Sequence, residues 1–561
     1  MAKNTTNSRT GFLVQGTILA VASLISRIIG LIYRIPLTHI IGDAGNDLYS
    51  CAFEIYNNLL IISSVSLPLA VSKLVSANIA QGRKRNVYRI LKCALIFGTV
   101  TGSIAALILL FGAEFITDTI MNTPYSIFAV RVLVPVLLIV AILGVLRGFF
   151  QGLGTMMPSA CSQILEQIAN AIVSVWAAYV LFDRGLKIGA VLGNSEQYAA
   201  AYGAMGGTLG TGVGAFVGLL FAAFVLAVYL KVFKKQMKRE RNAHVDSYSE
   251  IFKTLIVTIV PVLLSTTIYN CNNFIDMSVY KHIAEFQGYA ASDYNSWNGI
   301  YTGKYTTLIN VPVAIASSLS ASCVPALTAA YASGKRKEAL GQINTATRFI
   351  SVIAFPCAVG MSVLASPILQ MLFKDSSELA AHMVQLGALS IIFFSLSTLS
   401  NGLLQGINRM KEPIKNAALA LALQLLILVV GMFALDLNIY AMVGANISFG
   451  LFMSIFNLHS LKKYSGYRQE VRKTFLVPAI SAAGMGVVVF LVSRLLLMCT
   501  TGMAESVRLR GSIISLVSIP LGAITYAVLL LLLKGLTERE ILRFPKGELL
   551  VRLARKFHLL R

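Results

Sequence analysis

Two arginines and one lysine interrupt apolar stretches of the sequence that are long enough to be helices. Arg27 and Arg34 lie in the segment SRIIGLIYRIP, and Lys304 precedes Asn310 and Pro312 in another apolar segment. The two arginines are separated by nearly two helical turns, so both point to one side, about 10 Å apart along the axis. Guanidinium groups bind phosphate oxygens through paired hydrogen bonds, and an ammonium adds a point charge. Arg27, Arg34 and Lys304 are therefore candidates for binding a pyrophosphate.

The same three cations also permit a structural interpretation. A long basic side chain near the end of a membrane helix can extend to the lipid headgroups, which would account for Arg34 and Lys304. Arg27 would then pair with Glu54 or Asp276, which lie in other apolar segments. A charge at the centre of a membrane helix costs roughly 2.5–3.5 kcal/mol on insertion scales, so it needs either a partner or a ligand.

Three acids within apolar segments are candidates for binding an ion or carrying a proton. They are Glu54, Glu166 and Asp276. Asp276 ends the stretch NCNNFID, whose side-chain oxygens suit a sodium ion or a proton relay. Pairing with a buried cation explains Asp276 almost as well, so both interpretations stay open.

The sequence lacks the motifs of nucleotide and metal chemistry. A glycine-rich segment at 203–218 is not followed by GK[ST], and its small-xxx-small spacing is typical of close helix packing. The six histidines form no HExxH pair, and the seven cysteines form no CxxC pair. We therefore expect no ATP hydrolysis, no bound metal and no other cofactor. A sodium or proton gradient or the membrane potential then remains as the energy source.

These residues belong to a chain with the composition of a helical membrane protein. Of its 561 residues, 56% are hydrophobic and only 13% are charged, against about 25% charged residues in soluble domains. Apolar blocks such as 132–146, 417–435 and 513–533 approach the roughly 20 residues that cross a bilayer. They lack the alternation of barrel strands. The sequence therefore predicts an all-α integral membrane protein.

We predict fourteen membrane spans with both termini in the cytoplasm of a bacterial cell. On this assignment 35 of the 47 lysines and arginines lie in or next to the segments on one side, and six lie on the other. This asymmetry is the positive-inside signal of a plasma-membrane protein, so the net charge of +23 does not indicate nucleic-acid binding. The predicted spans lie near 12–33, 48–72, 90–112, 126–150, 158–182, 200–230, 251–280, 298–331, 345–372, 380–406, 414–434, 438–461, 475–499 and 510–533.

Two similar halves flank a basic segment near the middle of the chain. The motif GFFQG at 148–152 returns as GLLQG at 402–406, and QGRKR at 81–85 returns as SGKRK at 333–337. With six spans per half, the two halves would have parallel orientations, related by a pseudo-twofold axis along the membrane normal. We therefore predict an N-lobe at 1–230, a basic linker at 231–250, a C-lobe at 251–461, two extra helices at 475–533 and a basic amphipathic tail at 534–561.

Several short motifs resemble one branch of a transporter superfamily. The segments SRIIG at 26–30 and NFID at 273–276, with the paired Gln-Gly motifs, are similar to the MurJ and stage V sporulation protein B branch of the multidrug/oligosaccharidyl-lipid/polysaccharide exporter superfamily. The resemblance covers essentially the whole chain. It implies fourteen membrane helices, arranged as two six-helix lobes and two extra helices. It implies a flippase, not an enzyme, that moves lipid II or a related undecaprenyl-pyrophosphate-linked oligosaccharide outward by alternating access. Such a protein would serve cell-wall synthesis in growth or sporulation.

The match to that branch differs among the candidate residues. Arg27 matches its first-helix arginine, Arg34 matches the second after a one-residue shift, and Lys304 lies about one turn from its eighth-helix arginine. Residues 59–61 are apolar where the branch has a second-helix arginine. The segment 417–435 has no carboxylate, although an acid there completes a sodium site in some members.

The glycan and the coupling ion therefore stay open. The alternatives are a flippase for teichoic-acid, capsular or exopolysaccharide lipid intermediates, and a multidrug/cation antiporter of the same superfamily. A cavity that carries Arg27, Arg34 and Lys304 would repel cationic drugs and attract an anionic cargo. We expect a monomer whose partners are a lipid-linked oligosaccharide and membrane lipids.

Overall fold

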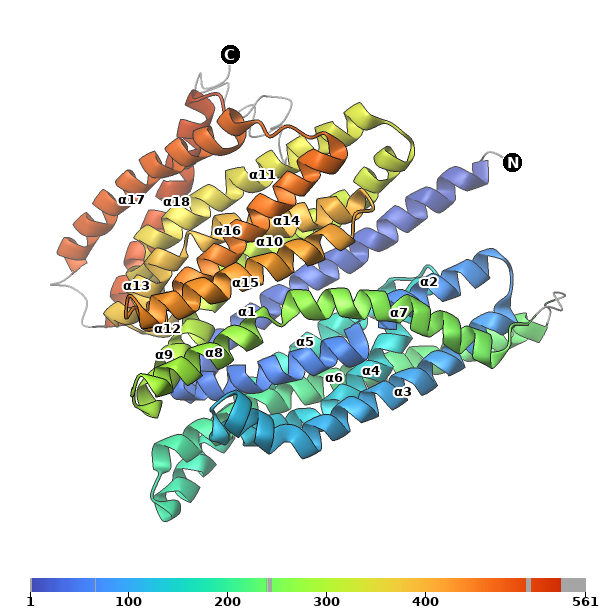
Figure 1. The fold of residues 1–561 in the computed structure, drawn as a ribbon, viewed down its shortest axis with the longest axis horizontal. Coiled ribbons are helices and arrows are strands. Elements are labelled where there is room, and N and C mark those ends of the chain that lie inside the picture. The colour runs from blue at the N-terminus through green and yellow to red at the C-terminus, as the bar shows by residue number, and fades with distance from the viewer. Residues whose placement is uncertain (1–2, 66, 239, 241–244, 501–505, 536–561) are drawn as a thin grey trace. The chain divides into compact units, whose positions relative to one another are not determined.

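The computed structural model describes residues 3–65, 67–238, 240, 245–500 and 506–535. These residues form helices joined by short turns, and no strand occurs among them (Figure 1). They divide into two compact units, Met1–Gly303 and Lys304–Arg561. The segment 251–303, predicted to open the C-lobe, thus packs with the first unit. The predicted lobe boundaries, which rest on the sequence repeat, stay a prediction.

The first unit is built from long helices with short connections. Short π-helical or 3₁₀ turns follow some of them, at Ile61–Val65, Ile116–Ile120 and Pro124–Ser126, and a π-helical turn at Tyr301–Tyr305 leads into the second unit, which begins at Lys304. The helices are α1 (Lys3–Leu60), α2 (Leu67–Ala80), α3 (Lys84–Phe115), α4 (Ile127–Gly152), α5 (Met157–Leu192), α6 (Ser195–Lys238), α7 (Tyr248–Asn270), α8 (Asn272–Phe286) and α9 (Ala291–Ile300).

α1 consists of two helices that meet at Gly42. The φ angle of Gly42 is +68°, a left-handed conformation that glycine adopts without steric cost. The first helix carries Arg27 and Arg34. The second runs to Leu60 and continues through the π-helical turn Ile61–Val65 toward α2. Gly42 thus interrupts the helix between the first two predicted spans.

α5 and α6 pack closely through the glycines of α6. A Cβ atom on Gly206 would lie 2.5 Å from the backbone N of Ala178, and one on Gly214 would lie 2.6 Å from the carbonyl oxygen of Glu166. Gly210 meets the backbone of Ser174 in the same way. The glycine-rich segment is therefore a helix-packing face, as its spacing predicted.

The second unit is also entirely helical in its described part. A π-helical turn at Arg472–Leu476 leads into α17, and α13 and α14 are bent by 43° at the break between them. The helices are α10 (Thr306–Ala332), α11 (Arg336–Val363), α12 (Ala365–Phe373), α13 (Glu378–Gly387), α14 (Ser390–Gly406), α15 (Lys411–Phe433), α16 (Ile439–Ser465), α17 (Val477–Thr500) and α18 (Val507–Leu532).

The described helices identify a multi-pass membrane protein. Ten are long and apolar enough to cross a bilayer, or eleven if the bent pair α13–α14 forms one span. The α-helical membrane architecture is thus confirmed. The count of fourteen spans and the two-lobe repeat stay predictions. The predicted amphipathic tail lies outside the described residues after Gly535.

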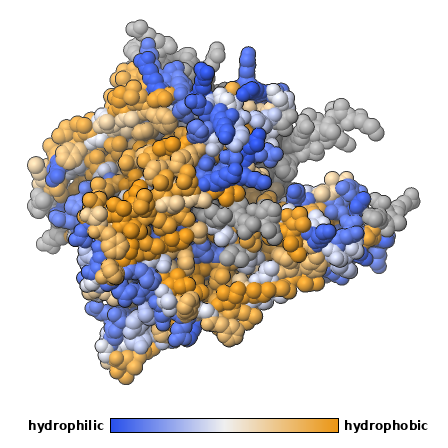
Figure 2. Space-filling model, viewed as in Figure 1, coloured by the Kyte–Doolittle hydropathy of each residue, from blue (hydrophilic) through white to orange (hydrophobic). Residues whose placement is uncertain are grey.

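The surface of the molecule is apolar over large areas. Figure 2 shows hydrophobic side chains gathered over much of the visible face. Many of the exposed large side chains are apolar, among them Phe111 on α3, which is 81% exposed, and Trp176 on α5. Soluble proteins rarely expose apolar patches of this extent, whereas lipid tails cover them in a membrane. The exposed faces of these helices are therefore lipid-facing surfaces.

Candidate functional site

Arg27 projects from the first half of α1, next to a contact between α1 and α5. Ser23, one turn earlier, donates a hydrogen bond from Oγ to Oε1 of Gln163 at 3.2 Å. Arg27 itself is exposed, and within the described part of the chain it forms no ion pair with Glu54 or Asp276. Its positive charge is therefore not neutralised by the partners that the structural interpretation required.

Arg34 lies over the ring of Tyr49, a buried residue in the second half of α1. The guanidinium carbon is 5.6 Å from the ring centroid. The Tyr49 and Tyr33 hydroxyls lie 3.5 Å apart, and Asn170 of α5 donates to the Tyr33 hydroxyl at 3.3 Å. A cation–π contact positions a guanidinium group without cancelling its charge. Arg34 is thus held in place and keeps a charge that can bind an anion.

Glu54 and Asp276 occupy different surroundings in the first unit. Glu54 accepts a hydrogen bond from Nδ2 of Asn273 at 3.4 Å and lies within electrostatic reach of Arg34. Asp276 lies on α8 and is 2% exposed, one turn after the buried Asn272. The structure therefore brings the NCNNFID stretch to Glu54. A role of either acid in ion coupling stays a prediction.

Glu166 of α5 has a basic partner that the sequence did not reveal. Nη2 of Arg147 on α4 donates to Oε2 of Glu166 at 2.7 Å, and Nε donates to Ser162 Oγ at 2.8 Å. The two charged side chains are 14% and 23% exposed. Ser159 ties the two helices together, because its hydroxyl donates to the carbonyl oxygen of Arg147 at 3.2 Å. The charges of Glu166 and Arg147 therefore compensate each other.

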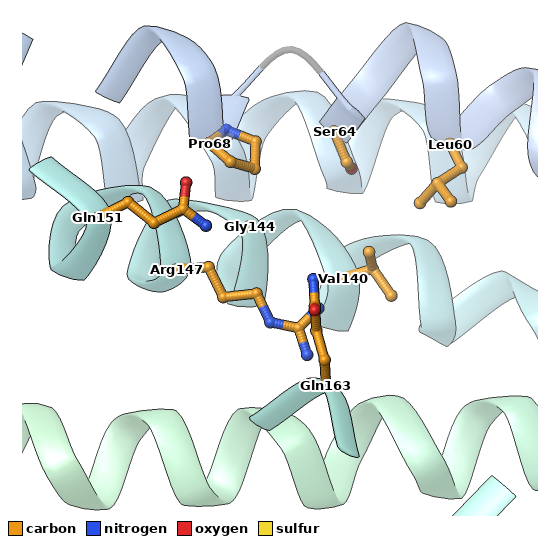
Figure 3. A pocket seen from close by; sticks show the side chains of 8 residues that line it. All are labelled: Leu60, Ser64, Pro68, Val140, Gly144, Arg147, Gln151 and Gln163. Atoms are coloured by element: carbon orange, nitrogen blue, oxygen red, sulfur yellow. The ribbon is translucent and has the colours of Figure 1, made fainter. Parts of the chain in front are cut away.

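A cavity of about 190 Å³ lies beside this ion pair, inside the first unit. Figure 3 shows Arg147 and Gln163 reaching toward each other from α4 and α5, with Gln151 one turn further along α4. The opposite wall comes from the end of α1, the π-helical turn and the start of α2. The lining residues are Leu60, Ser64, Pro68, Val140, Gly144, Arg147, Gln151 and Gln163.

Lys304 belongs to the second unit and is held there by Asp375. Its Nζ lies 2.7 Å from Oδ2 of the carboxylate, and the two side chains are 8% and 16% exposed. Burial opposes the ionisation of Asp375. Nevertheless, the hydrogen bond from Lys304, that from the backbone N–H of Ser377 and the charge of Lys304 together lower the pKa of this carboxyl below its ordinary value. Lys304 is thus an ordered, paired cation and does not extend freely to the interface.

A second buried ion pair joins Asp47 to Lys281 in the first unit. Lys281 Nζ donates to Asp47 Oδ2 at 2.7 Å, and both side chains are fully buried. Nδ2 of Asn298 donates to the other carboxylate oxygen at 2.6 Å. This pair has no signal in the sequence, because Lys281 follows a predicted span and 234 residues separate it from Asp47. The pair anchors α8 and α9 to the second half of α1.

The fold and these charged groups together define a polytopic helical membrane protein with cationic side chains inside or beside its helices. A family model for polysaccharide biosynthesis proteins matches residues 13–331, more than half of the chain, and a MatE model matches residues 303–431. The chain belongs to the polysaccharide biosynthesis protein family, within the exporter superfamily that its motifs resemble.

Curated relatives agree with this membership. The chain is 27% identical over 499 residues to the lipid II flippase MurJ of Bacillus subtilis (strain 168), covering 86% of this chain and 88% of that protein. It is 30% identical over 190 residues to stage V sporulation protein B of the same organism, which covers 34% of this chain and 36% of that protein.

Solved structures show the same fold at low sequence identity. An inward closed structure of lipid II flippase MurJ has a TM-score of 0.64 at 14% identity, covering 91% of this chain and 98% of that one. An inward-facing multidrug resistance transporter of the MATE family has a TM-score of 0.61 at 16% identity, covering 79% of this chain and 95% of that one. The MATE/MurJ-like fold is therefore confirmed.

Proposed function

We propose that the protein is a flippase that carries an undecaprenyl-pyrophosphate-linked oligosaccharide, with lipid II as the first candidate, across the plasma membrane by alternating access. The observation that carries this proposal is the similarity to a lipid II flippase over 86% of the chain. The unneutralised Arg27 and the ring-stacked Arg34 on α1 support it, because they provide the charge that a pyrophosphate requires.

The three cations are proposed to contribute unequally to pyrophosphate binding. Arg27 is the principal pyrophosphate ligand, and Arg34 is the second, oriented by Tyr49. Lys304 lies in the second unit, where Asp375 neutralises its charge, so it is the weakest of the three candidates. Flippases for teichoic-acid or capsular intermediates would use the same charges, so the glycan must be identified by experiment. A cationic drug would be repelled by Arg27 and Arg34.

The test uses cells in which the endogenous flippase is depleted and this chain is expressed. Arg27→Ala should abolish complementation at near-normal protein levels, and Arg27→Lys should restore only part of it, because an ammonium replaces a planar fork. Loss of hydrogen bonds to a charged group costs about 1.5–3 kcal/mol, a ten- to hundred-fold effect on binding. In the cells that express Arg27→Ala, a lipid II accessibility assay should show the precursor accumulating on the inner leaflet.

Arg34→Ala should have a milder effect, and Arg184→Ala, at a predicted loop on the outer side, is the matched control that should complement fully. Full complementation by an abundant Arg27→Ala, Arg34→Ala double variant would overturn the pyrophosphate proposal. Complementation of a teichoic-acid flippase defect, with none of a lipid II flippase defect, would keep the mechanism and reassign the glycan.

A further inference from the structure

The cavity beside the Arg147–Glu166 pair has a polar wall without net charge. Arg147 uses Nε and Nη2 on Ser162 and Glu166, and Glu166 neutralises it. The remaining polar groups are the Gln151 and Gln163 amides and a hydroxyl at Ser64. An amide and a hydroxyl each donate and accept hydrogen bonds, as sugar hydroxyl and acetamido groups do. The cavity therefore suits a neutral, polyhydroxylated group better than a phosphate.

Two of these groups have hydrogen-bonding capacity to spare. The Gln151 side chain forms no hydrogen bond with any residue that the structure describes. Gln163 accepts from Ser23 through Oε1, which leaves its amide NH₂ for another acceptor. Nη1 of Arg147 likewise makes no hydrogen bond to the described residues. Three sets of donors thus converge on one small space.

The size and the walls of the cavity limit what can enter. A volume of about 190 Å³ holds about six water molecules at roughly 30 Å³ each, the space of a single sugar ring. Leu60, Pro68 and Val140 supply an apolar surface opposite the polar groups, as in most small-molecule sites. The wall at Ser64 belongs to the π-helical turn Ile61–Val65, and such turns occur frequently at functional sites.

The cavity also lies close to the proposed pyrophosphate ligand. Ser23, whose hydroxyl binds Gln163, is four residues before Arg27 on the same helix, a rise of about 6 Å. A sugar attached directly to a pyrophosphate at Arg27 would therefore reach the cavity with its ring.

We propose that this cavity is the subsite for the first sugar of the lipid-linked cargo, bound through Gln151, Gln163 and Arg147. The inference rests on the proposed function and adds to it a source of glycan recognition separate from the pyrophosphate clamp. Arg147 acts here as a neutralised hydrogen-bond donor, whereas Arg27 acts as a charge.

The experiment compares two probes on the purified full-length protein in nanodiscs. One is undecaprenyl pyrophosphate, and the other is undecaprenyl-pyrophosphate-linked N-acetylglucosamine. Binding is measured by native mass spectrometry and by a competition assay. The wild-type protein should bind the sugar-bearing probe about ten-fold more tightly, because two or three neutral hydrogen bonds are added.

The variants Gln151→Leu and Gln163→Leu should each weaken binding of the sugar-bearing probe about five- to ten-fold. They should leave the sugar-free probe unchanged. Gln405→Leu, at the corresponding motif position of the second unit, is the control and should alter neither affinity. Thermal unfolding in the same nanodiscs verifies that each variant is folded.

The outcomes separate this inference from the proposed function. Equal wild-type affinities for the two probes would overturn the sugar subsite without any variant being needed. Equal losses for both probes in Gln151→Leu and Gln163→Leu would also overturn it. Arg27→Ala should weaken both probes alike. If the Arg27→Ala, Arg34→Ala double variant changes neither, the proposed pyrophosphate site fails, whatever the cavity does.

Discussion

At the residue scale, the charged side chains of the helices differ in whether the protein itself neutralises them. Arg147 with Glu166, Lys281 with Asp47 and Lys304 with Asp375 form pairs at 2.7 Å. Arg27 has no such acid in the described structure, and Arg34 rests on an aromatic ring. A free cation in a membrane protein indicates a ligand more strongly than a paired one, because the pair already offsets its own desolvation.

Lys304 provides the sharpest test of this distinction. Lys304→Met leaves the carboxylate of Asp375 without its cation, so it should lower the unfolding free energy by about 3 kcal/mol. Adding Asp375→Asn should restore most of the stability, as measured by thermal unfolding in detergent. If Lys304 also contacts the cargo, the double variant should still show reduced transport.

The matched control for this pair is Lys335→Met, which removes one partner of the exposed pair with Glu338. Such surface pairs contribute little, so neither its stability nor its transport should change measurably. Wild-type transport by the Lys304→Met, Asp375→Asn protein would return Lys304 to a purely structural role.

At the element scale, the buried pair of Asp47 and Lys281 fastens α8 and α9 to the second half of α1. Lys281→Met should destabilise the protein by about 3–5 kcal/mol, because the fully buried Asp47 would lose its cation and keep only the hydrogen bond from Asn298. The double variant Asp47→Asn, Lys281→Met should recover most of that loss. Hydrogen exchange should show α8 and α9 opening first in the single variant.

Lys187→Met is the control for this element, since Lys187 pairs with Asp183 on the surface at an i, i+4 spacing. It should leave the exchange pattern of α8 and α9 as in the wild type. If the single Lys281→Met variant also kept the wild-type exchange pattern, the anchoring role would be refuted.

Much of the element structure could be predicted, because a long apolar segment in lipid must be a helix. The close packing of the α6 glycines and the position of Arg27 and Arg34 on one helix could also be predicted from residue spacing alone. The breaks at Ile61–Val65 and between α13 and α14 did not, since they depend on packing between helices. The partner of Lys304 lies 71 residues away and that of Lys281 lies 234 away, so neither pair has a local signal.

The sequence repeat has a counterpart in the packing of each unit. In the first unit, a Cβ on Gly148 of α4 would lie 2.6 Å from the carbonyl oxygen of Pro68 on α2. In the second, Gly402 of α14 packs against Ser320 of α10, and Gly406 packs against Leu327. The same motif therefore makes the same kind of close helix contact in both units, which supports the predicted repeat.

At the scale of the whole molecule, the sequence predicts an energy source other than a nucleotide, because no GK[ST] follows the glycine-rich segment at 203–218. Transport of a lipid-linked oligosaccharide in proteoliposomes should proceed without ATP and respond to a sodium or proton gradient or to the membrane potential. Asp276→Asn should weaken that response if the buried carboxylate is the ion site. The exposed Asp183→Asn should leave it intact. An unaltered ion dependence in Asp276→Asn would leave Asp276 as a structural residue.

The placement of the basic residues predicts the orientation of the whole chain in the membrane. With 35 lysines and arginines on one side and six on the other, the basic side should stay in the cytoplasm. A fluorescent reporter inserted after Lys337 should therefore fold and fluoresce in the cytoplasm, whereas an alkaline phosphatase insertion near Asp293 should be active outside the membrane. An insertion near Lys187 should give the same external signal as the one near Asp293.

Because fourteen spans place an even number of crossings between the termini, a reporter at either end should be cytoplasmic. Phosphatase activity after Lys337, or fluorescence near Asp293, would contradict the fourteen-span arrangement and would require a different number of crossings before α10.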